Sequence, residues 1–297
     1  MSDIVIKNLP AHGEMKSTDV FILEDKDGNV TGKGSLGDLA EFVAKAWTFG
    51  NAGYHNSIYR GKNLGDHVTD EQWEAIQNGT FEGMYIGDYW VINGKTWRIA
   101  AFDYWYGFGD TACSTHHVVI VPDENLLAAD GSTTHYMNTS NITTGAYVGS
   151  GFYSGTNADN TSNTAKASCQ NMAKNAFGAA HILTHREHFQ NAMTDGHASG
   201  GSWYDSDVDI MNEPMVFGSY IFTPANDGVT IPNLYTIDNG QLPLFALNHR
   251  HICNRAYWWL RDAVSASYFA YVHGDGLCYC NLASIAWVGV RPAFGIC

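Results

Sequence analysis

The strongest constraint in the sequence is a pair of aromatic and β-branched runs joined by Asn93-Gly94, in GMYIGDYWVINGKTWRIAAFDYW (residues 83–105). Asn-Gly is typical of a two-residue β-hairpin, because both residues accept the positive φ of a type I′ turn. Another strand-like run, HHVVIVPDE, ends its apolar part at Pro122. We therefore expect an α+β protein built around a twisted antiparallel sheet.

The composition favours a loop-rich protein of short strands over a helical bundle. Charged residues make up only 15% of the 297 residues, whereas hydrophobic residues make up 45%. The net charge is −14 and Lys and Arg form no cluster, which argues against nucleic acid or an anionic membrane surface as a partner. No apolar run has the length of a membrane helix and no secretory signal opens the sequence, so we expect no membrane insertion and synthesis in a cytoplasm.

The first part of the chain is expected to be a separate module. Residues 1–47 contain short strand-like runs and then a helix pattern over 35–47, with Ser35 as its N-cap. A unit of this size has little core of its own, so we expect it to mediate attachment and oligomerisation, most simply as a homotrimer. Residues 48–297 are expected to form one larger domain.

Within the larger domain, Thr69 and Gln72 have the spacing of a helix capping box. The apolar periodicity predicts two more helices, over residues 164–178 and 182–193, and a long loop over 126–164. The strands expected after them are MVFGSYIFTP (215–224), FALN (245–248), YWWLRD (257–262), SYFAYVH (267–273), LCYCNL (277–282) and WVGVRPAF (287–294).

Several polar clusters allow both a chemical and a structural interpretation. His181, His185 and His188 would share one face of the helix over 182–193, either as a metal site or as surface histidines. Asp205, Asp207 and Asp209 alternate along an extended segment, either as calcium or magnesium ligands or as a solvated acidic edge.

The six cysteines fit no zinc motif, and they are interpreted as free thiols or as a disulfide framework. Cys278 and Cys280 would lie on the same side of a strand, where they can bind a soft metal or simply pack as two small side chains. No metal or cofactor is assigned from these patterns.

The C-terminal motifs carry a family likeness. YWWLRD, SYFAYV (267–272), GDG (274–276) and GVRPAF (289–294) resemble the C-type-lectin-type domain of variable proteins of diversity-generating retroelements, and similar domains in tail proteins of phages of gut bacteria. YRGKNLG (59–65), residues 83–105 and HILTHRE (181–187) look like the same phage group, so the likeness covers about residues 54–297. VFILED and SLGDLAEFV resemble the attachment modules that open tail-fibre proteins.

The resemblance implies a ligand-binding face in a variable region at about 257–297, held by a fixed scaffold. The implied scaffold residues are Trp258, Trp259, Leu260, Phe269, Val290, Arg291 and Pro292. The residues placed at the exposed face are Tyr268, Tyr271, His273, Asp275, Leu277, Cys278, Tyr279, Cys280, Asn281, Ile285 and Trp287. If Phe269 points inward, strict alternation along its strand cannot expose both Tyr268 and Tyr271, although a β-bulge can.

The function implied by the resemblance is that of a non-enzymatic receptor-binding protein at the tip of a phage tail. Its partners would be a bacterial cell-surface receptor, either a protein or a glycan, and other tail proteins of the virion. The related oxidases of the formylglycine-generating type share this fold and use a copper-binding cysteine pair, which gives the alternative of a metal-dependent oxidase. The Asn212-Glu213-Pro214 order departs from the calcium motifs of sugar-binding lectins. A third interpretation, a purely structural tail subunit, predicts no exposed aromatic face.

Overall fold

The computed structural model describes residues 20–24, 31–35, 51–127, 136–138, 140–143, 165–189, 192–194, 197–199, 202–222 and 240–297. The chain divides into two compact units, Met1–Tyr54 and His55–Cys297, and the division falls within α2 (Asn51–Asn56). In the first unit, β1 (Val20–Glu24) pairs antiparallel with β2 (Thr31–Ser35). The helix expected over 36–47 and most of the loop over 126–164 lie outside the described residues.

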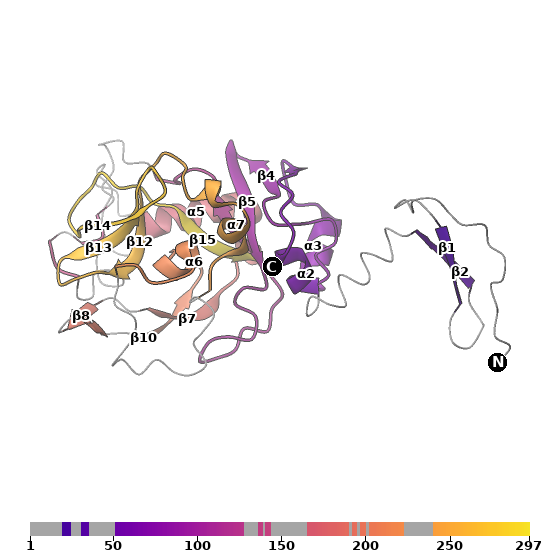
Figure 1. The fold of residues 1–297 in the computed structure, drawn as a ribbon, viewed down its shortest axis with the longest axis horizontal. Coiled ribbons are helices and arrows are strands. Elements are labelled where there is room, and N and C mark those ends of the chain that lie inside the picture. The colour runs from indigo at the N-terminus through magenta and orange to yellow at the C-terminus, as the bar shows by residue number, and fades with distance from the viewer. Residues whose placement is uncertain are drawn as a thin grey trace, which may run out of the picture. The chain divides into compact units, whose positions relative to one another are not determined.

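The second unit has a mixed α+β fold made mainly of strands (Figure 1). Its largest sheet has six strands in the order β11-β15-β6-β5-β4-β3. Their bounds are Val208–Ile210, Pro292–Ile296, Val118–Pro122, Lys95–Phe102, Tyr89–Ile92 and Asn63–Gly65. The predicted hairpin is confirmed: β4 and β5 are joined by Asn93 and Gly94, whose φ angles of 52° and 71° suit a type I′ turn.

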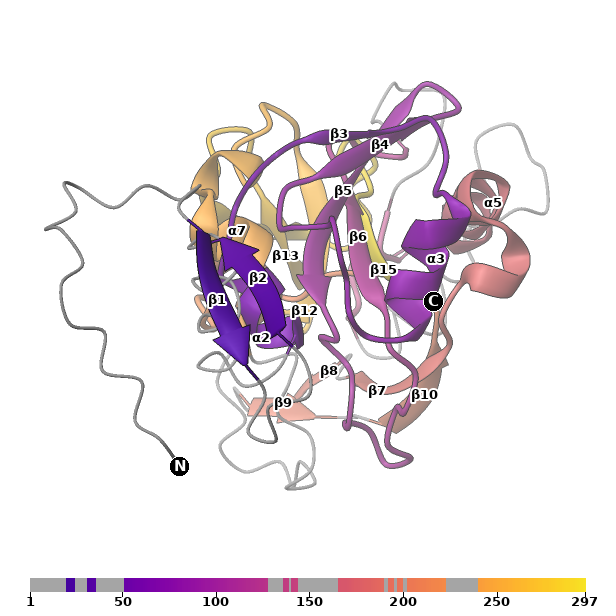
Figure 2. The same cartoon turned by 90° about the vertical axis from the view of Figure 1, so that its right-hand side faces the viewer.

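Two helices cover one face of the six-stranded sheet (Figure 2). In α5 (Ala165–Phe177), Phe177 packs edge-on against Trp97 and Phe294, whose ring centroids lie 5.6 and 5.8 Å away. In α3 (Asp70–Gln77), the predicted capping box between Thr69 and Gln72 is present. The packing of Phe177 against Trp97 and Phe294 holds the C-terminal strand β15 in the core.

A second sheet of three antiparallel strands lies at the opposite end of this unit from α3 (Figure 1). Its order is β12-β13-β14, with bounds Trp258–Ala263, Tyr268–Val272 and Cys278–Leu282. The strands expected for YWWLRD, SYFAYVH and LCYCNL are thereby confirmed. This sheet follows the short helix α7 (Pro243–Leu247), which contacts β5.

Two predicted strands are instead helices. Met215–Phe217 lies in α6 (Glu213–Phe217), and most of FALN lies in α7. In α6, the Asn212 side chain caps the helix by accepting a hydrogen bond from the Met215 N–H, and Gly218 ends it at φ 81°. Local helix signals therefore decide the structure of these apolar runs.

The helix expected over 182–193 is wrong. Residues 185–189 form β7 (His185–Phe189), which pairs antiparallel with β10 (Ser202–Ser206), and β8 (Ala192–Thr194) pairs with β9 (His197–Ser199). The strand is selected by its pairing with a distant segment, because His188 lies opposite Trp203 in this ladder. His181 lies outside β7 in a 3-10 helix, so the three histidines share no helical face.

A buried arginine joins the six-stranded and the three-stranded sheet of this unit. Arg291 is 1% exposed, and its guanidinium donates to the Pro122 carbonyl and to the His251 carbonyl, both at 2.7 Å. It also lies 5.2 Å from the ring centre of Trp258, on β12. Because burial disfavours the charged form, the pKa of Arg291 is lowered to about 10, so the side chain keeps its charge at neutral pH.

Replacing Arg291 with Met should lower the free energy of unfolding by about 3 kcal/mol, because one buried and one partly buried carbonyl acceptor lose a charged donor. Chemical denaturation monitored by tryptophan fluorescence measures this change. Arg250→Met is the matched control, since Arg250 is exposed and should change the free energy of unfolding by less than about 0.5 kcal/mol. Equal stability of the two variants would show that Arg291 does not hold the sheets together.

A buried histidine makes the stability depend on pH. The His117 ring is fully buried, donates from Nδ1 to the Thr115 carbonyl at 2.9 Å and accepts at Nε2 from the Trp105 N–H at 3.1 Å. These bonds require the neutral ring, and burial lowers the pKa of His117 from 6.5 to about 3. At pH values between about 3 and 6.5, the His117 ring is therefore neutral in the folded state and protonated in the unfolded state.

Between pH 6.5 and about 3, the free energy of unfolding should fall with decreasing pH by up to about 1.4 kcal/mol per pH unit for this one group. The contribution is fully present above pH 6.5 and is lost as the pH falls toward 3. The slope should become shallower in His117→Gln and stay unchanged in the control His249→Gln, whose side chain is exposed. Urea unfolding at several pH values measures the slopes, and identical slopes in both variants would contradict this assignment.

Candidate ligand-binding face

The site is built on the β13–β14 hairpin. The register runs without a shift from Tyr268↔Leu282 to Val272↔Cys278, and the turn lies at Gly274–Gly276 as expected. Gly276 has φ +88°, and the Asp275 carboxylate accepts a hydrogen bond from the Leu277 N–H at 3.0 Å. This bond and the neighbouring His273, whose Nδ1 lies 2.8 Å from the carboxylate, hold the pKa of Asp275 below its usual value.

Five aromatic side chains meet on one side of this hairpin, and we call them the aromatic face: Tyr257, Tyr271, His273, Tyr279 and Trp287. Tyr257 packs edge-on against His273 and Trp287, with ring centroids at 4.7 and 5.2 Å. Tyr279 lies 4.9 Å from His273 and 6.1 Å from Tyr271, and Trp287 lies 5.8 Å from Tyr271. The rings therefore form one continuous cluster in which each ring fixes its neighbours.

The backbone beneath the aromatic face is held by two hydrogen bonds to one carbonyl group. The Tyr257 carbonyl accepts hydrogen bonds from the Gly289 N–H and from the Asn125 side-chain amide, both at 2.9 Å. A Cβ atom at Gly289 would lie only 2.9 Å from the Leu127 carbonyl oxygen and 2.2 Å from Asn125 Nδ2, so a side chain at the start of GVRPAF would displace the backbone of Leu127 or the Asn125 side chain that bonds to Tyr257. The position of Tyr257 is thus set by a distant loop and by the C-terminal motif together.

The eleven residues that the resemblance placed at the face differ in exposure. Tyr268, Asp275, Leu277, Tyr279 and Trp287 are exposed, with Leu277 at 57%, Trp287 at 44% and Tyr279 at 41%. Those that are partly exposed are His273, Cys280, Asn281 and Ile285. The buried ones are Tyr271 at 6% and Cys278 at 9%.

The exposure expected for Tyr271 is therefore wrong, and alternation explains why. Without a bulge in the β13–β14 ladder, Tyr271 shares its side of β13 with Phe269 and lies between Trp259 and Tyr279, its partners in register. Tyr268 points to the other side at the far end of the strand, where it is 37% exposed. Tyr271 is the floor of the aromatic face and Tyr268 lies apart from it.

The exposure expected for Cys278 is also wrong, because this residue points to the covered side of the sheet. Its Sγ lies 3.4 Å from Oε1 of the buried Glu213 in α6. Burial and the Glu213 carboxylate raise the pKa of the Cys278 thiol, and burial raises the pKa of Cys280 as well. Both thiols are therefore held in the protonated form, on the side of the sheet opposite to Tyr279.

The sequence analysis did not place Tyr257 in the site. It stands one position before the strand β12, two residues from Trp259, and so on the same side of the sheet as Tyr271 and Tyr279. The signal that could have found it is this parity in YWWLRD, read together with the register of the next two strands. Its 37% exposure makes it part of the accessible surface of the aromatic face.

Neither of the two metal-ligand sets considered as alternatives is assembled. Asp209 is buried against Lys166, whose Nζ lies 2.8 Å from its carboxylate, and Asp207 is 3.3 Å from the same amine. Asp205 instead pairs with Arg186 at 2.9 Å, on the surface. Among the described residues, no three His, Cys, Asp or Glu side chains are grouped as ligands of one metal ion.

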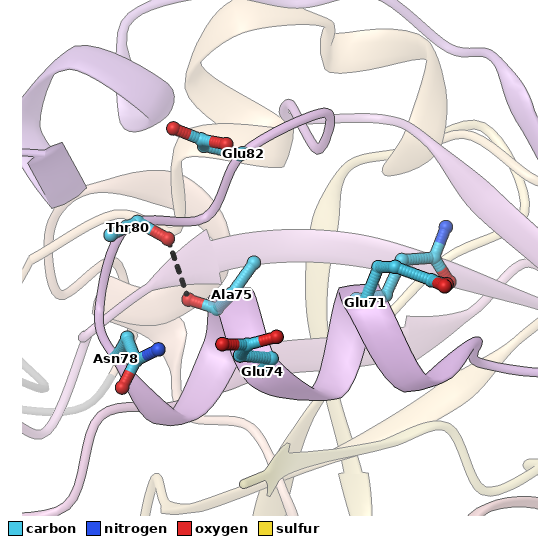
Figure 3. Close-up of a pocket in the computed structure, with 7 residues that line it drawn as sticks. Glu71, Glu74, Ala75, Asn78, Thr80 and Glu82 are labelled. Carbon is cyan, nitrogen blue, oxygen red and sulfur yellow. Dashed lines mark hydrogen bonds between the residues drawn. The ribbon is translucent and has the colours of Figure 1, made fainter.

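A shallow depression elsewhere, beside α3, is lined by acidic and neutral polar side chains (Figure 3). Its lining residues are Glu71, Gln72, Glu74, Ala75, Asn78, Thr80 and Glu82. The Thr80 hydroxyl donates to the Ala75 carbonyl, and the carboxylates of Glu71 and Glu74 extend from the helix. These side chains form a solvent-exposed helix surface, and their arrangement does not indicate a binding site.

Comparisons with protein-family models, with curated proteins and with solved structures found no match for this chain. The helices described by the structure include none with the length and apolar composition needed to cross a membrane.

The aromatic face contains both a buried ring, Tyr271, and exposed rings such as Tyr279, which should differ in their contribution to stability. Tyr271→Ala should lower the free energy of unfolding by about 3 kcal/mol, because it empties the space between Trp259, Tyr279 and Trp287. Tyr279→Ala removes an exposed ring and should cost less than about 1 kcal/mol. Urea denaturation of both variants tests the difference, and equal losses would mean that both rings belong to the core or both to the surface.

Proposed function

We propose that the protein is a receptor-binding protein of a phage tail, with a C-type-lectin-type domain that presents the aromatic face to a bacterial cell-surface receptor. The observation that carries this proposal is the exposure of Tyr257, Leu277, Tyr279 and Trp287 together on one side of a sheet whose strands β12 and β13 are almost entirely buried. Interface anchors are typically large aromatic side chains grouped in this way.

The arrangement of the scaffold supports the proposal. The expected scaffold residues Trp258, Trp259, Leu260, Phe269 and Arg291 are all exposed by no more than 1%. Rigid rings beside adaptable polar groups, here His273, Asp275 and Asn281, are the chemistry of a paratope, because they bind at little cost in conformational entropy. Side chains on such a face can change while the buried side of the sheet keeps the fold, as diversification by a retroelement requires.

The alternatives receive less support. For a metal-dependent oxidase of the formylglycine-generating type, both cysteines would have to be accessible to one metal ion, whereas Cys278 is buried with its Sγ 3.4 Å from the Glu213 carboxylate. A purely structural tail subunit predicts no exposed aromatic face, and the exposure of Tyr279 and Trp287 argues against it. Attachment and trimerisation are proposed for the first unit, and tail proteins as its partners.

The test is binding of the purified, fluorescently labelled full chain to intact cells of a panel of gut bacteria, measured by flow cytometry. Trp287→Ala and Tyr279→Ala should each weaken binding to a responsive strain by about thirtyfold, the effect of losing an interface anchor of about 2 kcal/mol. The melting temperature should change by less than about 3 °C.

Tyr106→Ala is the matched control, because Tyr106 is also 41% exposed but lies outside the aromatic face. This variant should bind like the unmodified chain. Binding that survives both replacements in the aromatic face, or that is lost equally in the Tyr106 variant, would refute the proposed site.

A further inference from the structure

The outer edge of β14 has backbone groups that no described residue bonds to. At the two ends of the hairpin, the His273 N–H donates to the Leu277 carbonyl and the Ala283 N–H to the Ser267 carbonyl, both at 2.9 Å. Hydrogen-bonded pairs alternate in an antiparallel ladder, so residues 277, 279, 281 and 283 bond to β13 and residues 278 and 280 direct their backbone groups outward. Among the described residues, nothing bonds to the outward N–H and C=O groups of Cys278 and Cys280.

The other edge of the same sheet is covered. On β12, the Trp259 N–H donates to the Gly289 carbonyl and the Arg261 N–H to the Met211 carbonyl, both at 3.0 Å. Natural proteins usually protect an edge strand by covering it or by placing charges or proline on it. The sequence of β14, CYCNL, contains neither a charged residue nor proline. The contrast indicates that the β14 edge is available for another strand.

A row of aromatic side chains crosses the three-stranded sheet and ends on β14. Trp259, Tyr271 and Tyr279 lie opposite one another in register across the three strands, and Tyr279 is the last of them. Because Tyr279 bonds to β13, a new antiparallel strand would meet it in a non-hydrogen-bonded pair, in which facing side chains come closest. A docked strand would therefore extend the ladder with a side chain against Tyr279, while its backbone bonds to Cys278 and Cys280.

The charge of the chain indicates which strand fits. Asp275, at the turn that begins β14, is exposed and has a lowered pKa, and the whole chain has a net charge of −14. Repulsion between two such chains disfavours a second copy at this edge, whereas a basic segment is attracted to it. We propose that the receptor is a protein and that an extended, Lys- or Arg-containing segment of it adds to β14 as a fourth strand.

This inference rests on the proposed function, because it takes the aromatic face as the binding surface, and it is tested at the backbone. Cys280→Pro removes the outward N–H and puts a ring in its place, and it leaves the bonds of Tyr279 and Asn281 to β13 intact. Cys280→Ala is the matched control, because it removes the thiol and keeps the N–H.

The probe is a library of random dodecapeptides, selected on the immobilised full chain. The selected peptides should be rich in Lys or Arg. They should bind the unmodified chain and Cys280→Ala with equal affinity, and they should bind Cys280→Pro at least about tenfold more weakly. In the unmodified chain, the same peptides should slow hydrogen exchange of the Cys278 and Cys280 amides, a measurement that does not depend on the folding of any variant.

Four results would overturn strand addition: no enriched peptide, equal binding to Cys280→Pro, unprotected amides, or a dimer of the unmodified chain that Cys280→Pro abolishes.

With cells of a responsive strain, binding should be lost after protease treatment and kept after periodate oxidation, and the reverse would assign the receptor to a glycan. Loss of cell binding in Tyr279→Ala but not in Cys280→Pro would keep the proposed function and reject this inference.

Discussion

The architecture of the second unit depends on the buried guanidinium of Arg291. A charge at this depth is tolerated only if its donors are satisfied, and the Pro122 and His251 carbonyls accept from it on opposite sides of the junction. Pro122 ends β6 in the large sheet, and His251 precedes β12 in the small one. The two sheets are therefore fixed to each other by a group that cannot move without losing its acceptors.

The small sheet uses this fixed position to divide its residues between two tasks. Trp258, Val272 and Cys278 face α6 and α7 and are buried, so they contribute to the core. On the other side, Tyr271 is covered by Tyr279 and by its other aromatic neighbours, so the outer rings stand on a packed floor. Because the exposed rings contribute little to the core, they can be replaced at small cost in stability, as a surface that changes its ligand requires.

In the proposed binding surface, side chains and backbone would contribute two different kinds of recognition. The rings of the aromatic face contribute apolar area and depend on the identity of each residue. The edge of β14 contributes amide and carbonyl groups, which stay the same when side chains change. A binding face that combines the two would keep a constant mode of docking while its specificity is altered by substitution.

The sequence by itself determined the features that depend on a few neighbouring residues. The Asn93-Gly94 turn, the capping box of Thr69 and Gln72 and the hairpin at Gly274–Gly276 follow from local geometry and alternation. The burial of Trp258 and Phe269 was expected from the family resemblance. The helix α6 was equally local, and its signals at Asn212 and Gly218 were present but outweighed by an apolar run.

Only the tertiary structure decided what depends on contacts between distant segments. Residues 185–189 become a strand because β10 supplies their hydrogen bonds, and Tyr257 joins the aromatic face because Gly289 and Asn125 hold its carbonyl. The β14 edge is open because no distant segment among the described residues pairs with it, whereas Gly289 and Met211 cover β12. Pairing and burial are properties of the folded arrangement, since each requires a partner whose position the local sequence does not encode.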